Sequence, residues 1–343
     1  MRTRPKVVIS VLPTSLVSRR QRDRQLVGAR ATARSDSGLV SHKEVSVIVV
    51  SYNGRDVLER CLSALDTERH EVIVVDNGSD DGSPELVRER FPDVTLIESD
   101  ANVGFGAANN LGMRRATGTY FALVNSDAWP IDDGLEALVD FAKRDSRVGI
   151  AGPRLLREDG TRQLSVRGFP TVWRLCTEYF FLRKLAPSSR LFNAFYAGGF
   201  DYTTVREADW LMGAALVVRR ELIDEIGGFD ERFFLFSEEV DLCYRAGSAG
   251  WRVVYTPDVS FIHLGGASTR PVWSRMYREQ LRGHVLFLEK HEGTETAERA
   301  RAWLVRALRF RSLVFRGDRG QTYAEAARWL GSRSVEALVQ SSE

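Results

Sequence analysis

The sequence predicts an α/β fold with a mostly parallel central sheet, wound by helices on both faces, and a helical C-terminal extension. Short, uncharged runs of β-branched residues alternate with stretches in which apolar residues recur at helical spacing. Strands that alternate with helices are typical of parallel sheets, because a parallel connection needs a crossover helix. At roughly 150 residues per domain, the 343 residues are enough for two domains, or for one large domain with extensions.

The expected elements follow one another from residue 45 onward. Residues 45–50 (VSVIVV) carry no charge, which is typical of a strand buried on both faces. Residues 55–65 hold apolar side chains at a 3.6-residue period, which predicts a helix. The turn-rich loop 76–84 caps a second helix. The expected strands are 45–50, 71–75, 94–98 and 120–124, and the expected helices are 55–65, 85–91 and 107–117.

Polar residues follow each of the four expected strands at its carboxyl end. In open sheets of this kind, ligands bind beyond the carboxyl ends of the strands. Four polar strand ends that converge on one edge therefore predict a binding site there. The four clusters are Ser51-Tyr52-Asn53, Asp76-Asn77, Asn102-Val103-Gly104 and Asn125-Ser126-Asp127.

Two residues are candidate metal ligands. Asp127 directly follows an apolar strand, where a carboxylate can hold a hard cation such as Mg²⁺ or Mn²⁺. The alternative is that Asp127 caps the following turn. His263 follows an apolar stretch and precedes a glycine pair that lets the backbone approach a ligand closely. The alternative for His263 is a structural histidine with a hydrogen-bond partner. Only the pairing of Asp127 with His263 favours the metal site.

Three carboxylates follow four mostly aromatic residues in F-F-L-F-S-E-E-V-D-L-C-Y-R. Apolar neighbours and adjacent like charges both raise the pKa of a carboxylate, which suits a general base. On a helix that begins near Ser237, Glu238 and Asp241 share one face. Glu239 points elsewhere, so two roles are separable. In a plain structural alternative, Ser237 caps the helix, the acids complement its dipole, and Asp241 pairs with Arg245.

The net charge and the cysteines limit which binding partners and which cellular compartment the sequence favours. With 48 Lys and Arg against 46 Asp and Glu, the net charge of +2 is too balanced to make nucleic acid an expected partner. The three cysteines form no C-x-x-C pair, so neither a zinc site nor a disulfide framework is indicated. A reducing, cytoplasmic setting fits best. No apolar run reaches the roughly 20 residues of a membrane-spanning helix.

Both ends of the chain are basic. Residues 1–44 are expected to form a flexible basic arm. Residues 295–319 predict a helix with an apolar stripe among several arginines. Such a helix could make peripheral contact with an anionic membrane surface, or it could pack its stripe on the main domain and point its arginines at water. The stripe consists of Trp303, Leu304, Leu308 and Phe315.

Seven motifs run in order from Val45 to Thr269. They are V-S-V-I-V-V-S-Y-N-G, V-V-D-N-G-S-D-D-G-S, N-V-G-F-G-A-A-N-N-L-G, L-V-N-S-D, W-L-M-G-A-A-L-V-V-R-R, G-G-F-D-E-R-F-F-L-F-S-E-E-V-D-L-C-Y-R and H-L-G-G-A-S-T. Together they resemble family 2 glycosyltransferases, especially their bacterial rhamnosyltransferase-like branch. The resemblance implies a GT-A fold with a nucleotide-binding half at 45–130 and an acceptor half at 131–269. Residues 270–343, outside the resemblance, are expected to form a helical basic extension.

By this resemblance, the donor nucleotide is held near the first strands. Tyr52 and Asp76 would hold the nucleobase and its sugar, with Asp76 accepting a pyrimidine N–H. Asn102 and Asn109 would help to shape the donor pocket. Asn125, at the end of the fourth strand, would also contact the donor.

The resemblance also implies a divalent cation that bridges the donor diphosphate. Asn125 and Asp127 occupy the ends of the family's D-x-D motif, and Asp127 with His263 would bind the cation. The first position of this motif is Asn rather than Asp, so cation binding would depend more on the diphosphate.

The acceptor half carries the expected base. Glu239 occupies the general base position, as the second acid of the family's E-D pair, and is a Glu where Asp is common. Trp210, Gly213 and Glu238 belong to segments that line the sugar and acceptor cleft.

The resemblance implies an inverting glycosyltransferase that uses a nucleotide-sugar donor, with dTDP-rhamnose as the favoured donor. The expected acceptor is a saccharide or a lipid-diphosphate-linked saccharide of the cell envelope, at the inner membrane face. Two other functions are considered. A sugar nucleotidyltransferase lacks support, because S-Y-N-G-R-D replaces its Gly-rich loop after the first strand. A non-catalytic binding protein with the same fold is disfavoured by the joint presence of Asp127, Glu239 and His263.

Overall fold

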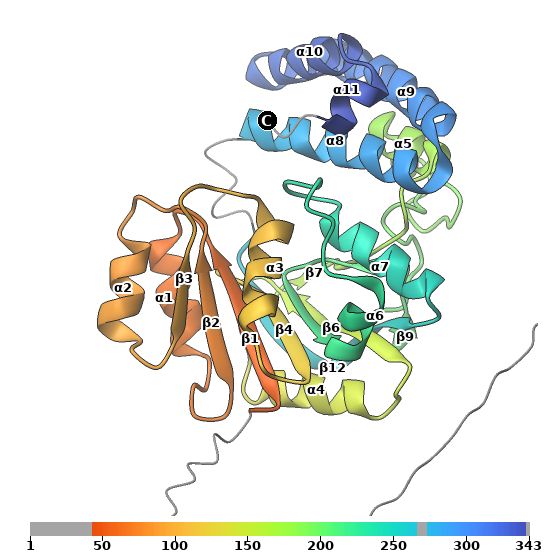
Figure 1. Ribbon diagram of the computed structural model, residues 1–343. Coiled ribbons are helices and arrows are strands. Elements are labelled where there is room, and N and C mark those ends of the chain that lie inside the picture. Colours follow the sequence, from red (N-terminus) through yellow and green to blue (C-terminus); the bar gives the residue numbers. More distant parts are fainter. Residues whose placement is uncertain (1–42, 266–272, 341–343) are drawn as a thin grey trace, which may run out of the picture. The chain divides into compact units, whose positions relative to one another are not determined.

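The four strands that the sequence predicts form one half of a central sheet. They are β1 (Val45–Ser51), β2 (Glu71–Asp76), β3 (Thr95–Glu98) and β4 (Tyr120–Asn125). β1 pairs in parallel with β2 and β4, and β2 pairs in parallel with β3. The computed structural model describes residues 43–265 and 273–340 (Figure 1). Most of the predicted basic arm and the end of the H-L-G-G-A-S-T motif lie outside the described residues.

Later strands extend the sheet and make it mixed. The added strands are β5 (Ala128–Pro130), β6 (Val148–Leu156), β7 (Arg162–Gln163), β9 (Arg206–Glu207), β11 (Ala215–Arg219) and β12 (Arg252–His263). The main strand order is β3-β2-β1-β4-β11-β6-β12-β5. β11 is antiparallel to both neighbours, whereas β12 is parallel to β6. A separate ribbon joins β8 (Val166–Arg167) to β10 (Trp210–Leu211).

The alternating side chains of the strands divide the core into two clusters, one on each face of the sheet. In β1, Val47 and Val49 belong to one cluster, and Ile48 and Val50 belong to the other. The first face packs against α1 (Arg55–Ser63), α2 (Ser83–Arg90) and α4 (Gly134–Lys143). The second face packs against α3 (Phe105–Arg115), α6 (Arg220–Ile226) and α7 (Glu238–Ser248). The expected fold class, with helices on both faces, is confirmed.

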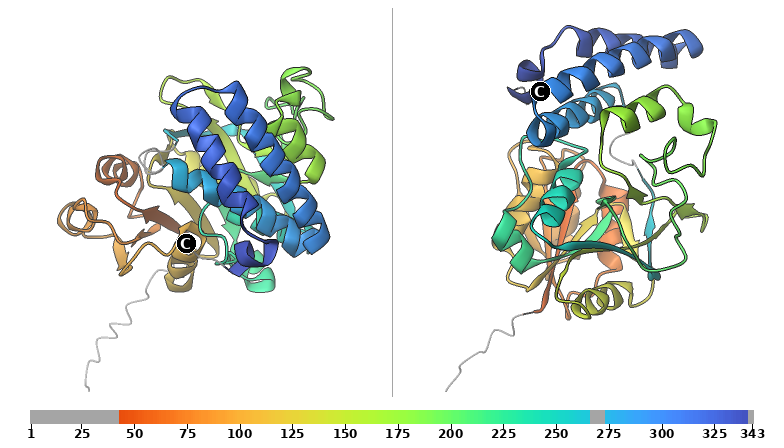
Figure 2. Two further views of the ribbon diagram at one scale, coloured as in Figure 1. Left: turned by 90° about the horizontal axis from the view of Figure 1, so that it is seen from above. Right: turned by 90° about the vertical axis from the view of Figure 1, so that its right-hand side faces the viewer.

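A helical layer lies beyond the carboxyl ends of β1 and β4, above α7 in the view of Figure 1 (Figures 1 and 2). It contains α5 (Val172–Tyr179), followed by the short helix η1 (Leu182–Lys184), and the C-terminal helices α8 (Trp273–Glu292), α9 (Thr294–Val314), α10 (Asp318–Gly331) and α11 (Val335–Gln340). Leu281 of α8 and Leu304 of α9 belong to the same buried cluster as Phe121 of the sheet. The helical extension therefore shares its core with the central sheet.

The helix expected over residues 295–319 ends early. α9 stops at Val314, and Gly317, with a φ of 64°, precedes α10. Leu304 and Leu308 are buried, as the packing alternative expects, but Trp303 is 45% exposed. The apolar stripe is thus divided between the core and the surface. Within the described residues, none of the helices has the length and apolar character needed to span a bilayer.

Candidate active site

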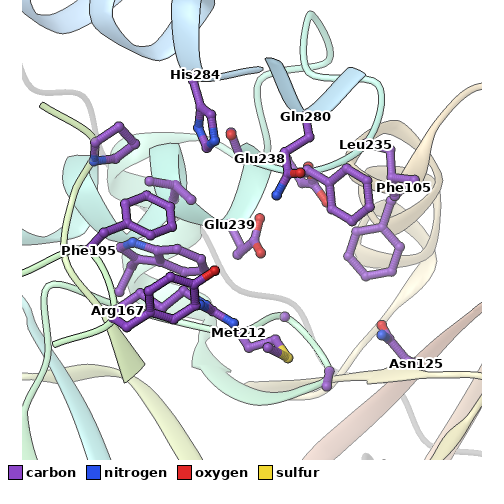
Figure 3. A pocket seen from close by; sticks show the side chains of 18 of the residues that line it. Phe105, Asn125, Arg167, Phe195, Met212, Leu235, Glu238, Glu239, Gln280 and His284 are labelled. Atoms are coloured by element: carbon purple, nitrogen blue, oxygen red, sulfur yellow. The ribbon is translucent and has the colours of Figure 1, made fainter. Parts of the chain in front are cut away.

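A cavity of about 310 Å³ lies between the carboxyl end of β4, the N-terminus of α7, and α8 (Figure 3). Six residues singled out from the sequence line it: Asn125, Trp210, Gly213, Glu238, Glu239 and His263. The other five, Tyr52, Asp76, Asn102, Asn109 and Asp127, are not among its lining residues. The structure therefore brings the expected base and cleft residues together, and it leaves the nucleotide residues at the neighbouring strand ends.

A sharp turn presents two acids to the cavity. Phe236 and Ser237 have φ values of 66° and 74°, a left-handed conformation that is uncommon for residues other than glycine. α8 passes this turn so closely that a Cβ on Gly283 would lie 2.7 Å from Ser237 Oγ. Ser237 is the N-cap residue of α7, but its side chain makes no capping hydrogen bond. The alternative in which this side chain caps the helix is therefore wrong, because the left-handed turn and α8 set its direction instead.

Glu238 and Glu239 form a carboxyl pair at the start of α7, in which Glu238 is buried and Glu239 is partly exposed. The Oε2 atom of each has no hydrogen-bond partner among the described residues. Burial and the charge of Glu239 raise the pKa of Glu238 well above its ordinary value. Burial also raises the pKa of Glu239, while backbone N–H groups and the positive charge of Arg167 oppose that rise. This asymmetry favours a proton on Glu238 and a negative charge on Glu239.

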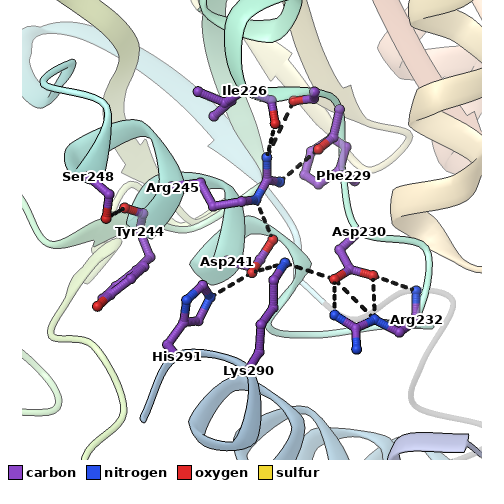
Figure 4. Close-up of polar contacts among 12 residues, drawn as sticks. Ile226, Phe229, Asp230, Arg232, Asp241, Tyr244, Arg245, Ser248, Lys290 and His291 are labelled. Atoms are coloured by element: carbon purple, nitrogen blue, oxygen red, sulfur yellow. Dashed lines mark hydrogen bonds and ion pairs between the residues drawn. The ribbon is translucent and has the colours of Figure 1, made fainter. Parts of the chain in front are cut away.

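Asp241 belongs to a different site (Figure 4). It accepts from Arg245 Nε at 2.7 Å and from His291 Nε2 at 2.8 Å, and its Oδ1 lies 2.7 Å from Lys290 Nζ. Burial raises the pKa of Asp241, but these bonds and charges more than offset it and hold the pKa below its ordinary value. The expected pair with Arg245 is confirmed. The expected grouping of Asp241 with Glu238 is wrong, because this network ties Asp241 to α8 while both glutamates line the cavity.

Arg167 and two aromatic rings form one wall of the cavity. The Arg167 guanidinium lies 4.4 Å from the ring centroid of Tyr196 and 5.9 Å from that of Trp210. Trp210 Nε1 donates to the Gly168 carbonyl at 3.0 Å, which fixes the indole ring. A planar cation and aromatic faces of this kind suit the apolar and hydroxyl faces of a sugar. Arg167 and Tyr196 have no place in the sequence motifs, and only the two-residue strand β8 brings Arg167 here.

α8 contributes two cavity residues that sequence reasoning missed, Gln280 and His284 (Figure 3). The His284 ring meets Tyr179 and Phe195 edge-on, at centroid distances of 6.2 and 5.8 Å. Burial lowers the pKa of His284 to about 4, so the imidazole is neutral at pH 7. Its Nδ1 has no hydrogen-bond partner in the described part of the chain. The available signal was their i, i+4 spacing on one helix, which by itself does not identify a site.

Strand pairing brings the two candidate metal ligands together. β5 pairs with the end of β12 so that His263 faces Ala128, and the Leu264 N–H donates to the Asp127 carbonyl. His263 Nε2 consequently lies 3.4 Å from Asp127 Oδ1. His263 Nδ1 donates to Gln163 Oε1 at 2.7 Å, which leaves the Nε2 lone pair directed toward Asp127. Gln163 was also missed, because it lies on the two-residue strand β7.

Tyr52 and Asp76 lie at the ends of β1 and β2, Asn102 lies in the loop after β3, and Asn109 lies on α3. Asp76 Oδ2 accepts from the Ser79 N–H, whereas Oδ1 is buried and lacks a partner among the described residues. Asn102 Oδ1 accepts from Asn77 Nδ2 and from the Gly104 N–H. Asn109 is 1% exposed and donates to the Phe105 carbonyl of its own helix. The two asparagines therefore organise the loop and helix after β3.

The chain is similar to known glycosyltransferases. The model of the family described as Glycosyl transferase family 2 matches residues 46–205. An N-acetylglucosaminyl-diphospho-decaprenol L-rhamnosyltransferase of Mycobacterium tuberculosis (strain ATCC 25618 / H37Rv) is 32% identical over 262 residues, which are 72% of this chain and 85% of the relative. Rhamnosyltransferase WbbL of Escherichia coli (strain K12) is 25% identical over 259 residues, 72% of this chain and 93% of the relative.

Solved structures share the fold. A mannosyltransferase from Pyrobaculum calidifontis, solved with GDP-Man and Mn²⁺, has a TM-score of 0.50 at 20% identity and covers 84% of this chain and 85% of its own. GalNAc-T7, solved with UDP, GalNAc and Mn²⁺, has a TM-score of 0.53 at 14% identity. The match covers 88% of this chain and 57% of the GalNAc-T7 chain. The fold is thus that of a GT-A glycosyltransferase. The chain belongs to glycosyl transferase family 2, and the predicted family is confirmed.

Proposed function

We propose that this glycosyltransferase transfers L-rhamnose from dTDP-rhamnose to a hydroxyl of a lipid-diphosphate-linked saccharide, with inversion at the anomeric carbon. The product would serve the synthesis of a cell-envelope polysaccharide. The names of the mycobacterial and Escherichia coli relatives support rhamnose as the sugar, and the mycobacterial name supports a prenyl-diphosphate-linked acceptor. The observation that carries the proposal is the pair of Glu238, which is buried, and Glu239, which is partly exposed, in a cavity lined by aromatic rings.

The donor nucleotide would bind at the ends of β1 and β2. The sheet register places Ser51 beside Asp76, so Tyr52 directly follows the pair. The orphaned Oδ1 of Asp76 is an acceptor for a pyrimidine N–H. Asn102 and Asn109 would shape this pocket indirectly, through the loop and helix that their amides hold.

Asp127 and His263 fit a divalent cation at the donor diphosphate. A carboxylate and an imidazole with its Nε2 lone pair directed at that carboxylate are suitable ligands, and the buried Oδ1 of Asn125 has no partner in the described residues. No group of three His, Cys, Asp or Glu side chains within the described ranges could hold a metal, so the diphosphate would complete the site. When bound, such a cation stabilises the charge that develops on the leaving diphosphate.

Glu239 would act as the general base. In its ionised form it accepts the proton of the acceptor hydroxyl as that oxygen attacks the anomeric carbon from the face opposite the leaving diphosphate. Glu238, in its protonated form, would donate a hydrogen bond to the acceptor. Gly213 lies beside Glu239, because an added Cβ there would lie 3.6 Å from the Glu239 Cβ. Trp210 would provide the face on which a sugar ring stacks.

The proposed setting is the cytoplasmic face of a membrane. The three cysteines are free, and the charge balance gives no reason to propose nucleic acid as a partner. A lipid-linked acceptor requires that the protein work beside a bilayer, so peripheral membrane contact belongs to the proposal.

The test is a transfer assay with the purified full-length chain and an N-acetylglucosaminyl-diphospho-prenol acceptor. dTDP-rhamnose, a uridine-diphosphate sugar and a guanosine-diphosphate sugar are offered separately with Mn²⁺. We expect the product to gain one rhamnose, with inverted configuration by NMR, and only with dTDP-rhamnose. Transfer from a different donor would overturn the choice of sugar. Nucleotide binding without transfer to any saccharide would favour the non-catalytic alternative.

A further inference from the structure

Exposed apolar side chains gather in two segments that pack against each other. Among the described residues, seven of the ten exposed large hydrophobic side chains lie within residues 173–191 or 303–314. Leu313 is 83% exposed and Val314 is 53% exposed, at the end of α9. Soluble monomers rarely leave apolar residues clustered in this way unless the cluster contacts something.

The two segments form a single apolar groove. Phe180, just after α5, meets Trp303 and Phe310 of α9 at centroid distances of 6.1 and 5.9 Å. The groove has a volume of about 660 Å³ and is lined by apolar side chains of both segments, including Trp173 and Leu182. We call this groove, together with Leu313 and Val314, the α5–α9 surface. Figure 2 shows α5 beside α9 in both views.

The α5–α9 surface is bordered by positive charge. Residues 299–317 contain six arginines and no acid. Arg306 and Arg309 are exposed on α9, and Lys184 is exposed after α5. Glu178 is the acid of α5, and it is neutralised by Arg183 and Arg311. An apolar patch with a basic border complements an anionic lipid surface, which accepts apolar side chains between acyl chains and attracts arginines to its headgroups.

We propose that the α5–α9 surface docks this protein on an anionic lipid bilayer. The inference deepens the proposed function and rests on it, because a lipid-linked acceptor must be met at a membrane. The chain connects the two sites directly: Pro170 lines the catalytic cavity, and Val172 lines the groove. Docking would therefore hold the cavity beside the lipid headgroups, where the saccharide of the acceptor lies.

The test is co-sedimentation of the full-length chain with vesicles. Phosphatidylcholine vesicles with and without an equal part of phosphatidylglycerol are compared at low and high salt. We expect binding to the anionic vesicles that weakens as salt screens the arginines. Binding that is equal on neutral and anionic vesicles would overturn the proposed charge complementarity.

Matched variants locate the surface. Leu313→Gln with Val314→Gln changes only exposed side chains, and we expect vesicle binding to fall about tenfold or more, as loss of buried apolar area predicts. Arg306→Gln with Arg309→Gln should weaken binding to anionic vesicles by about 25-fold at low salt, from roughly fivefold for each charge. The controls are Val205→Gln, which is 45% exposed elsewhere, and Arg144→Gln at the end of α4. Equal losses in the controls would overturn the assignment.

Two further measurements separate this inference from the proposed function and from self-association. Transfer to a short-chain, water-soluble acceptor should be unchanged in the surface variants. If the wild type does not transfer sugar to this acceptor, the proposed function is contradicted, and vesicle binding stands as a separate result. If ultracentrifugation shows a dimer that the Leu313 and Val314 substitutions dissociate, and vesicle binding is absent, the surface binds a second copy and the membrane proposal fails.

Discussion

Glu238 and Glu239 are neighbours in the chain, but their surroundings differ. Glu238 is 3% exposed, and its pKa is raised by burial and by the charge of Glu239. Glu239 is partly exposed, and the positive charge of Arg167 opposes the rise of its pKa. One carboxyl of such a pair keeps its proton while the other ionises. The same pair can therefore supply a hydrogen-bond donor and a base.

Arg167→Gln tests this assignment through the pH dependence of kcat/KM. Loss of the guanidinium removes a positive charge that favours ionised Glu239, so the pKa of Glu239 rises. The base then loses its proton only at higher pH, and the acid limb of the profile should move to higher pH. Arg206→Gln, an exposed substitution outside the cavity, is the control. An unmoved limb, or a shift in the opposite direction, contradicts the assignment.

Asp127→Ala tests the proposed cation site by calorimetry. In the wild type, removal of divalent cation by a chelator should weaken binding of thymidine diphosphate. In the variant, we expect affinity with Mn²⁺ to fall by about 10- to 100-fold, the range typical of losses around a metal site. Asp258→Ala, exposed on the strand that carries His263, is the matched control. Full affinity in Asp127→Ala would remove Asp127 from the site.

At the scale of elements, α8 packs against the turn that carries the proposed base. Gly283 allows this helix to pass the positive-φ residues Phe236 and Ser237 at van der Waals distance. A Cβ at position 283 would meet Ser237 Oγ at 2.7 Å and the Phe236 carbonyl oxygen at 2.8 Å. The C-terminal extension therefore contributes to the proposed active site, through this contact and through Gln280 and His284.

Gly283→Ala should reduce both activity and stability. The added methyl displaces the turn or the helix, and a shift of about 1 Å near a catalytic group can lower kcat by about 10²-fold. Overpacking of this kind costs about 1 to 3 kcal/mol in the free energy of unfolding. Gly247→Ala in α7 is the control, because its Cβ would meet nothing within 4 Å. Equal kcat in the two variants would show that α8 does not position the turn.

Asp241→Asn tests the network that joins α7 to α8. It removes the buried negative charge that binds Arg245, Lys290 and His291, so we expect a loss of about 3 to 5 kcal/mol in urea unfolding at pH 7. The matched substitution of the exposed Asp140, Asp140→Asn, should lower the free energy of unfolding far less.

The pH dependence of the Asp241 effect has a fixed sign. The pKa of Asp241 is depressed in the folded state, so its contribution is complete above the unfolded value near 3.8 and is lost as pH falls through the folded pKa. The difference between wild type and Asp241→Asn should therefore shrink in acid. A difference that grows in acid would contradict the network.

At the scale of the whole molecule, local pattern predicted the nucleotide-binding half better than the rest. β1 to β4 and their polar ends are encoded by contiguous runs, so their periodicity and turns identify them. The cluster of Glu238, Glu239 and Asp241 was singled out for the same reason, although the pattern grouped Glu238 with Asp241 and not with Glu239. By contrast, the short strands β7 and β8 place Gln163 and Arg167 by tertiary pairing, which no local pattern reveals.

The helical extension shows the same limit. Its arginines and apolar residues predicted a basic helix, but which residues are buried depends on the neighbouring α5 and α8. Leu304 enters the shared core, whereas Trp303 stays on the surface beside Phe180. Lining of the cavity by Gln280 and His284 also depends on this packing. Because both parts of the chain contribute to this core, the sequence of one part alone does not show which of its residues are buried.

The most direct measurement compares turnover of the wild type and Glu239→Gln with dTDP-rhamnose and a prenyl-diphosphate-linked acceptor, with nucleotide binding measured alongside. The exposed Glu221→Gln serves as the control. If Glu239 is the base, its replacement lowers kcat by about 10² to 10⁴ while thymidine diphosphate binds as before. Unchanged turnover in Glu239→Gln, with the protein folded and binding nucleotide, would contradict the central role given to this carboxylate.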